Sequence, residues 1–255
     1  MVNVYIIDPL MFACCCAMAL IAGVVKGVVG FAMPTILISG LGSLIAPELA
    51  LAGLILPTLV TNGMQALRQG WSAAADSISR FRVFLLVGLV TLLAAAQLVP
   101  VMSSAVMFLI IGLVVTGLAS VQLLGWKPKM SKGGGTRAEV LVGGLAGVIG
   151  GISGSWGAPT VSYLTAIGTE KTEQMRVQGV IYGLGAVALT VAHIWSGIFN
   201  WTSALFSLAL VAPAVLGMWI GGQMQDRIDQ AGFRRVTLLV LLLAGLNLVR
   251  RGYMS

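Results

Sequence analysis

Apolar segments long enough to form helices recur along the whole chain, and they limit the available folds more than any other feature. A helix that crosses a bilayer needs about 20 mostly apolar residues. Only 9% of the 255 residues are charged, whereas a soluble domain carries roughly 25%, so the chain cannot cover a water-facing surface. We therefore predict an all-α integral membrane protein. Its apolar segments cover approximately residues 10–27, 34–46, 49–67, 83–99, 104–124, 138–152, 159–168, 177–195, 203–222 and 234–249.

The charged and reactive residues argue against several other functions. The formal net charge is +7, but the basic residues form short clusters between apolar segments, which is typical of a membrane protein's loops and not of a nucleic-acid surface. The three cysteines are consecutive, at 14–16, and neighbours on a helix point in different directions, so they cannot chelate one metal together. No catalytic set of residues is apparent. We therefore expect no enzyme activity, no cofactor, no metal and no nucleic-acid partner.

The chain divides into two related halves. The one polar, basic and glycine-rich linker spans 125–137, and we predict a membrane repeat at 1–124, a cytoplasmic linker at 125–137 and a second membrane repeat at 138–255. A glycine-rich motif occurs once in each half, with one residue inserted in the second copy. Gly23, Gly27, Gly30, Pro34 and Thr35 correspond to Gly147, Gly151, Gly154, Pro159 and Thr160.

The distribution of Lys and Arg predicts that the two halves have opposite orientations in the membrane. If basic connections face the cytoplasm, each basic connection of one half corresponds to an uncharged or acidic one of the other. Inverted repeats of this kind are typical of secondary transporters. Arg250 and Arg251 would lie on the outer side and do not fit the pattern. Lys and Arg occur at 68–82, 125–137, 169–176 and 226–235, and are absent from 46–48, 100–103 and 196–202.

The second apolar segment of each half is too short to cross a bilayer. As helices, 34–46 and 159–168 would rise only about 20 Å and 15 Å, against a hydrocarbon core of about 30 Å. We therefore expect each half to contain a re-entrant helical hairpin plus three transmembrane helices. The hairpin tips, at 27–35 and 151–160, would direct two helix N-termini toward the middle of the membrane. Such N-termini bind anions, because their N–H groups are free and carry partial positive charge.

We predict that the anion binds at the two tips and at polar residues near them. Lys26 either pairs with the anion or extends to the membrane surface, and Arg176 either binds the anion or only marks topology. Asn62 and Gln65 either line a polar path or bond helices together. The glycines, alternatively, only allow helices to pack closely. The candidate substrate-binding residues are Lys26, Gly30, Phe31, Thr35, Asn62, Gln65, Ser153, Gly154, Ser155, Trp156, Thr160, Arg176 and Gln178.

The two tip sequences resemble a known family signature. Residues 27–35 (GVVGFAMPT) and 150–160 (GGISGSWGAPT) look like the duplicated motif of the TauE/SafE sulfite exporter family, also called the toluene sulfonate uptake permease family. The similarity extends over nearly the whole chain. It implies a multi-pass transporter of the bacterial inner membrane that carries sulfite, sulfoacetate or related organosulfonates. Lys26 stands where the second half has Gly150, so the two tips differ chemically.

We therefore expect a secondary transporter that works by alternating access around the two tips. The alternative from another class is an accessory or scaffold subunit of a membrane complex. An intramembrane enzyme is a third reading, which the lack of a catalytic set disfavours. The sequence leaves open which anion is carried, the direction of transport, the coupling ion and the oligomeric state, a homodimer included.

Overall fold

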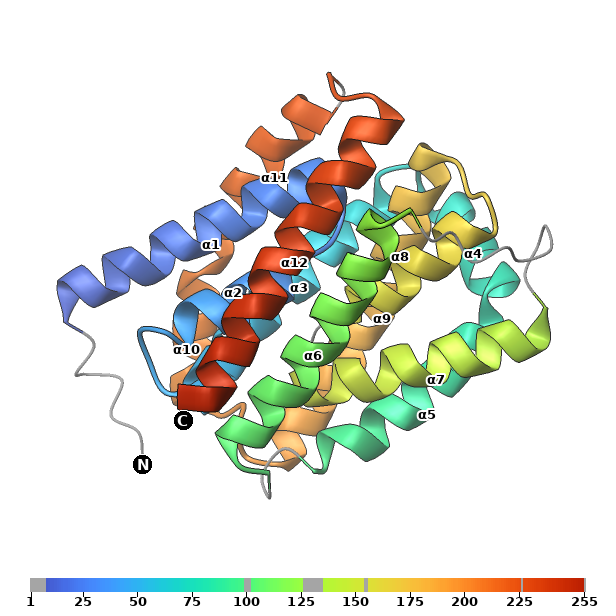
Figure 1. Ribbon diagram of the computed structural model, residues 1–255. Helices are drawn as coiled ribbons and strands as arrows, with labels where there is room; N and C mark the ends of the chain where they lie inside the picture. The colour runs from blue at the N-terminus through green and yellow to red at the C-terminus, as the bar shows by residue number, and fades with distance from the viewer. Residues whose placement is uncertain (1–7, 99–101, 126–134, 154–155, 226, 255) are drawn as a thin grey trace.

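The computed structural model describes residues 8–98, 102–125, 135–153, 156–225 and 227–254, and these residues form twelve α-helices (Figure 1). The first half contains α1 (Pro9–Val29), α2 (Met33–Leu41), α3 (Pro47–Leu67), α4 (Trp71–Arg80), α5 (Arg82–Ala96) and α6 (Ser104–Leu123). The second half contains α7 (Thr136–Ser153), α8 (Gly157–Ala166), α9 (Lys171–Trp195), α10 (Trp201–Ala209), α11 (Val211–Gln225) and α12 (Gln230–Met254).

The helices of the second half repeat the order and approximate lengths of those in the first. The packing repeats as well: α1 of the first half packs on α11 of the second, and the equivalent α7 of the second half packs on α5 of the first. Two further pairs, α3 with α9 and α6 with α12, join equivalent helices of the two halves. The contacts are therefore largely unchanged when the halves are exchanged, as they would be around a pseudo-two-fold axis.

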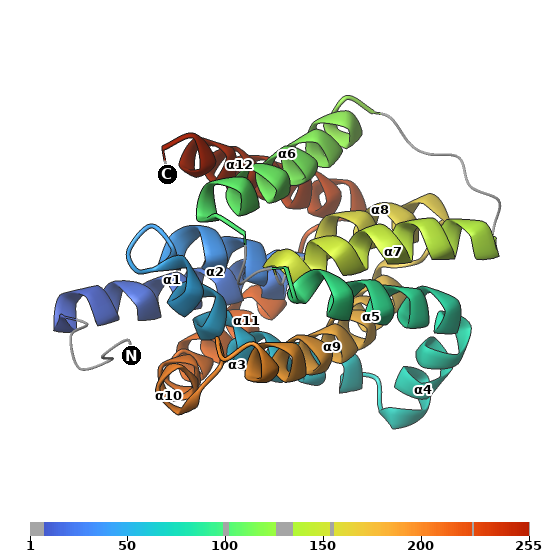
Figure 2. The ribbon, with the colours of Figure 1, turned by 90° about the horizontal axis from the view of Figure 1, so that it is seen from below.

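Close glycine contacts give the helix directions. α1 runs parallel to α11, α7 runs parallel to α5, and α3 runs antiparallel to α9. The end of α11 and the junction between α4 and α5 both lie beside the start of α9, so α1 and α7 run in opposite directions. Figures 1 and 2 show α1 and α7 approaching the middle of the bundle from opposite sides. The contacts that fix these directions are Gly23 with Ala214, Gly27 with Gly222, Gly143 with Phe84, Gly151 with Leu92, Gly179 with Gln65 and Gly183 with Asn62.

Several basic side chains gather at one end of the bundle. Arg68 Nη1 donates to Gln225 Oε1 over 3.4 Å, and Lys171 Nζ donates to the Gln225 carbonyl over 2.9 Å. Arg80 forms an ion pair with Glu173 at the same end. The ends of α3 and α11 and the starts of α5 and α9 therefore share one basic end.

Arg251, which did not fit the charge pattern, has a structural role at the opposite end. Its guanidinium donates to the carbonyl of Gly42, the residue that ends α2, and its Cζ lies 4.3 Å from the centroid of the Phe108 ring. A cation at a helix C-terminus is favourable because the unpaired carbonyls there carry partial negative charge. Arg251 thus holds the end of the short helix α2.

The helices agree with the predicted segments to within a few residues, with four differences. The predicted segment 203–222 is divided into α10 and α11 at residue 210. The segment 68–82 was expected to be a loop, but it contains α4, which turns into α5 through 78°. α9 begins at Lys171 instead of 177, so Arg176 lies inside its second turn. Pro34 and Pro159 were expected at the first helical position, but they are the second residue of α2 and the third of α8. Both prolines lie in the first turn of their helices, where a missing N–H costs nothing.

The described residues include four helices that are long and apolar enough to cross a membrane, or five if α4 and α5 count as one span. The chain is therefore a multi-pass membrane protein. α1 has 21 residues and passes this test by itself. Trp201–Gln225, which contains α10 and α11, counts as one of these spans, and α4 counts only together with α5. The short helices α2 and α8, with 9 and 10 residues, belong to no candidate span and are too short to cross.

A proline inside α3 is compensated by a side chain from α10. Pro57 has no N–H, so the carbonyl four residues earlier, on Gly53, loses its helical partner. The hydroxyl of Ser207 donates to that carbonyl over 3.0 Å and accepts from the Leu56 N–H over 3.0 Å. α10 thereby stabilises the centre of α3, the helix that carries Asn62 and Gln65.

Candidate functional site

The first tip joins α1 to α2 through two residues in the left-handed backbone region. Gly30 ends α1 with φ +83°, and its N–H donates to the Lys26 carbonyl over 2.7 Å. Ala32 precedes α2 with φ +71°. Glycine adopts this conformation freely, but for alanine it costs roughly 1–2 kcal/mol. Strain of this kind in a buried turn is common at ligand sites.

The second tip joins α7 to α8. Ser153 is the last residue of α7, and its side chain lies outside the described part of the structure, as do Gly154 and Ser155. Trp156 is buried beside Gly157, the first residue of α8. The Thr160 hydroxyl donates to the Trp156 carbonyl over 2.9 Å. Thr160 was expected to donate to the anion, but in this structure it donates to the tip backbone.

The two tips meet in the interior of the bundle. Phe31 of the first tip lies against Gly157 of the second, where an added Cβ would come within 2.7 Å of the Phe31 ring. A cavity between them is lined by Lys26, Phe31, Ala32, Pro34, Asn62, Trp156, Gly157 and Tyr182. Its volume is about 10 Å³, which is close to the minimum for one water molecule. This conformation is therefore closed around the site and too tight for a sulfite-sized anion.

Among the residues that the structure describes, Lys26 is the only charged one that lines this cavity. Its side chain is 1% exposed, and its ammonium donates a hydrogen bond to Asn62 Oδ1 on α3. The Nζ atom lies 6.0 Å from the centroid of the Tyr182 ring. Lys26 does not extend to the surface, so the alternative of a snorkelling side chain does not describe this structure.

Two helix N-termini add positive potential at the cavity. α2 begins beside Ala32 and Pro34, and α8 begins at Gly157, all of which line the cavity. No side chain caps the start of α2. Free N–H groups at a helix start favour a negative charge. With Lys26, the site presents three sources of positive charge to one small space.

A larger, basic vestibule lies next to the cavity, and Lys26 is part of the wall of both. The vestibule has a volume of about 310 Å³ and lies toward the basic end of the bundle. Gln65 and Gly27 line it, and so do three basic residues: Arg68, Lys171 and Arg176. Clustered positive charge at the mouth of a cleft attracts anions and speeds their entry.

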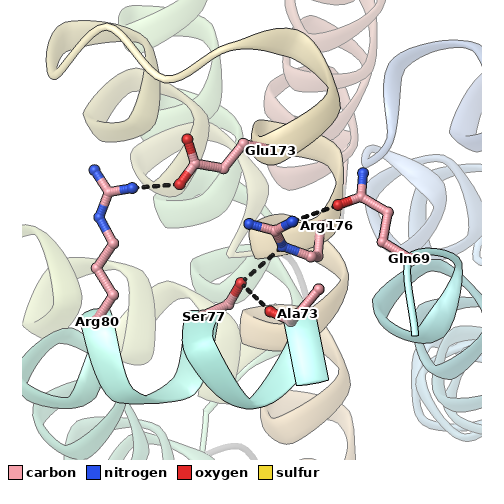
Figure 3. A network of polar contacts seen from close by, with 6 residues as sticks. All are labelled: Gln69, Ala73, Ser77, Arg80, Glu173 and Arg176. Atoms are coloured by element: carbon pink, nitrogen blue, oxygen red, sulfur yellow. Dashed lines mark hydrogen bonds and ion pairs between the residues drawn. The ribbon is translucent and has the colours of Figure 1, made fainter. Parts of the chain in front are cut away.

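Arg176 lies in the vestibule and not at the tips. Its Nε donates to the Ser77 hydroxyl over 3.0 Å, and its Nη1 donates to Gln69 Oε1 (Figure 3). Beside it, Arg80 of α4 pairs with Glu173 of α9. These contacts attach α4 to the first turns of α9, and they leave Arg176 only part of its hydrogen-bonding capacity for an anion.

Gln178, Gln65 and Thr35 are all buried close to the first tip or beside the vestibule. Gln178 is 0% exposed and adjoins Gly30, and neither its amide nitrogen nor its amide oxygen has a hydrogen-bond partner. Gln65 donates to the Met175 carbonyl over 2.7 Å, but its Oε1 has no partner. Thr35 is fully buried in α2 and does not line the cavity. Buried amides without partners are rare and often mark an unfilled polar site.

Several residues of this region were not among the predicted site residues. The Tyr182 ring is tilted against that of Trp156, with ring centroids 6.2 Å apart. Its position as a polar residue inside an apolar segment could have identified Tyr182 from the sequence. Gly157 belongs to the repeated motif region but aligns with no glycine of the first tip. Arg68 and Lys171 were interpreted as topology signals, and only the folded structure brings them together in the vestibule.

Comparison with known proteins gives one match. The model of the family described as "Sulfite exporter TauE/SafE" matches residues 15–248, which include both tips, the linker and all the residues that line the cavity. No curated protein and no solved structure showed significant similarity to the chain.

Proposed function

The chain belongs to the sulfite exporter TauE/SafE family, and we propose that it transports sulfite, sulfoacetate or another small organosulfonate by alternating access around the paired tips. Family membership itself implies a membrane transporter of sulfite or a related anion, and a transporter family is consistent with the expected lack of enzyme activity. The bacterial inner membrane is the location that we propose.

One observation carries the choice of an anion. Lys26 is fully buried, and its described partner is the neutral side chain of Asn62. Among the described residues the one ion pair joins Arg80 to Glu173, so no carboxylate neutralises Lys26 there. A buried unpaired cation costs several kcal/mol within a membrane. A bound oxyanion would remove that cost, and a sulfonate can accept hydrogen bonds from both tips at once.

The helix directions support the proposed inverted repeat. In the proposed arrangement, repeat 1 (1–124) and repeat 2 (138–255) are related by a two-fold axis in the membrane plane, and the linker 125–137 is cytoplasmic. α1 and α7 then enter the membrane from opposite sides, and α2 and α8 return to the side of entry. The antiparallel α1 and α7, the exchangeable contacts and the shared basic end support this arrangement.

Alternating access would then move the site between two openings. The closed cavity and the vestibule meet at Lys26. We propose that the anion passes from the basic vestibule, past Lys26, into a cavity that widens as the tips separate. Phe31 and Gly157 form the contact that must open, because they close the cavity between the tips.

Purified protein in liposomes tests this function. We expect the wild-type chain alone to move sulfite or sulfoacetate across the bilayer, whereas an accessory or scaffold subunit would not. Gly30→Ala should abolish transport, because its Cβ would meet Gln178 and Met175 at the tip. Gly197→Ala is the matched control, since Gly197 also has a left-handed φ, of +76°, but no neighbour within 4 Å of the added Cβ.

The outcomes separate the alternatives. Transport by the wild type and by Gly197→Ala, but not by Gly30→Ala, would support the tips as the transport site. No transport of any sulfur-containing anion by well-folded wild-type protein would favour the accessory subunit. Equal transport by both glycine variants would show that the hairpin tips only pack the helices.

A further inference from the structure

A large apolar groove lies on the outside of the bundle between α4, α5, α7 and α9. Its volume is about 460 Å³, within the range of roughly 300–1,000 Å³ that is usual for ligand sites. Leu86 and Val187 line it and are 63% and 51% exposed, so it opens to the surroundings. In a membrane protein those surroundings are lipid.

Of the described residues that line the groove, Arg82 is the one that carries a charge. It is exposed, it is the first residue of α5, and it follows Arg80 at the basic end of the bundle. The start of α5 adds partial positive charge at the same place. The corresponding helix of the other half, α11, begins with the uncharged Val211, so this combination is specific to the basic end.

The inner wall of the groove includes Trp156 of the second tip. The same side chain lines the central cavity, so its ring separates the groove from the proposed substrate site. Gly185 and Gly150 adjoin this ring, and an added Cβ on Gly185 would come within 3.1 Å of it. Whatever fills the groove therefore contacts the residue that supports the second tip.

We propose that this groove binds one acyl chain of an anionic phospholipid, with the phosphate of the head group at Arg82. The groove is too apolar for a sulfonate, but an acyl chain matches it. Basic residues between transmembrane helices bind anionic head groups, and Arg82 supplies such a residue at this groove. The bound chain packs against Trp156 and holds the second tip in place. This lipid site is separate from the site of the transported anion, so the proposal of a lipid does not depend on the proposed function.

Native mass spectrometry of the purified, delipidated full chain tests the site, with phosphatidylglycerol or phosphatidylcholine added. We expect the wild type to retain one phosphatidylglycerol at several-fold lower lipid concentration than phosphatidylcholine. Val187→Trp fills the groove and should remove this adduct. Val191→Trp is the matched control, one turn further along α9, 39% exposed and outside the groove lining. If Val187→Trp is not monodisperse, Leu184→Trp, which also lines the groove, replaces it.

The charge is tested in the same way. Arg82→Gln should make the two lipids bind equally, whereas Arg227→Gln, an exposed arginine outside the groove lining, should behave as wild type. Equal adducts in Val187→Trp and Val191→Trp would overturn the proposal. The proposal would also be overturned if Arg227→Gln and Arg82→Gln reduced the preference for phosphatidylglycerol equally. The preference would then come from general surface charge and not from Arg82.

Discussion

Replacing Lys26 by methionine separates the roles of its charge and its volume. Methionine fills a similar space but removes the ammonium that donates to Asn62 and lines the closed cavity. A charge-assisted hydrogen bond contributes about 1.5–3 kcal/mol. Since 1.4 kcal/mol is a factor of ten in affinity, we expect the dissociation constant for the carried anion to rise by roughly 10- to 100-fold.

The same substitution should leave the empty protein about as stable as before. Removing a buried, unneutralised cation relieves a cost of several kcal/mol, while the Asn62 oxygen left without a donor adds back about 1–3 kcal/mol. Ligand stabilisation should fall instead. At a ligand concentration of 100 times the wild-type dissociation constant, the bound anion stabilises the wild type by about 2.7 kcal/mol. At the same concentration it stabilises a variant with hundredfold weaker affinity by about 0.4 kcal/mol.

Calorimetry and thermal unfolding, with sulfite and sulfoacetate on monodisperse protein, measure both quantities. Arg235→Gln, an exposed arginine near the start of α12, serves as the control for a lost positive charge. Wild-type affinity in Lys26→Met would refute the anion site at the tips. A large loss of thermal stability without ligand would show that Lys26 holds the fold instead of serving the substrate.

Three further outcomes follow from the structure. Gly157→Ala places a Cβ within 2.7 Å of the Phe31 ring and should destabilise the closed tips by about 1–3 kcal/mol in thermal unfolding. Gly63→Ala is the control, because nothing lies within 4 Å of its added Cβ. Equal melting temperatures of the two variants would contradict the tip contact. Ser207→Ala leaves the carbonyl freed by the proline of α3 without a donor, and should cost about 1–3 kcal/mol; an unchanged melting temperature would show that water or rearranged backbone replaces the bond. In a cysteine-free background, a cysteine at Thr202 should react with an impermeant maleimide from outside intact cells and one at Ser131 should not; labelling of both would rule out the inverted arrangement.

The class of protein and the position of most helices could be predicted from the sequence alone. Both depend on local properties: a run of apolar residues long enough for a bilayer, and glycine or proline where a helix stops. Gly30 and Pro34 mark the first tip in this way, and the structure places the left-handed turn between them. The repeat could also be predicted from the sequence, because the same glycine and proline pattern of a tight turn occurs twice in the chain.

The helix within segment 68–82 could not be predicted from local sequence properties. The segment is polar and charged, so it was expected to be a loop, yet ten of its residues form α4. Its helix is stabilised from outside the segment, by Arg176 and Glu173 of α9. A short amphipathic helix of this kind has no long apolar run to reveal it, and most of its stability comes from packing.

The surroundings of the candidate site, in contrast, depend on how the helices pack against one another. Nothing local indicates that Asn62 accepts a hydrogen bond from Lys26, 36 residues earlier, or that Phe31 lies on Gly157. These neighbours depend on the register in which whole helices pack, and that register is set by the sum of many small contacts along α1, α3, α8 and α9. Hydrophobicity and turn residues specify each helix separately, so the sequence could indicate the two tips, but only their packing against one another creates a closed, positively charged cavity.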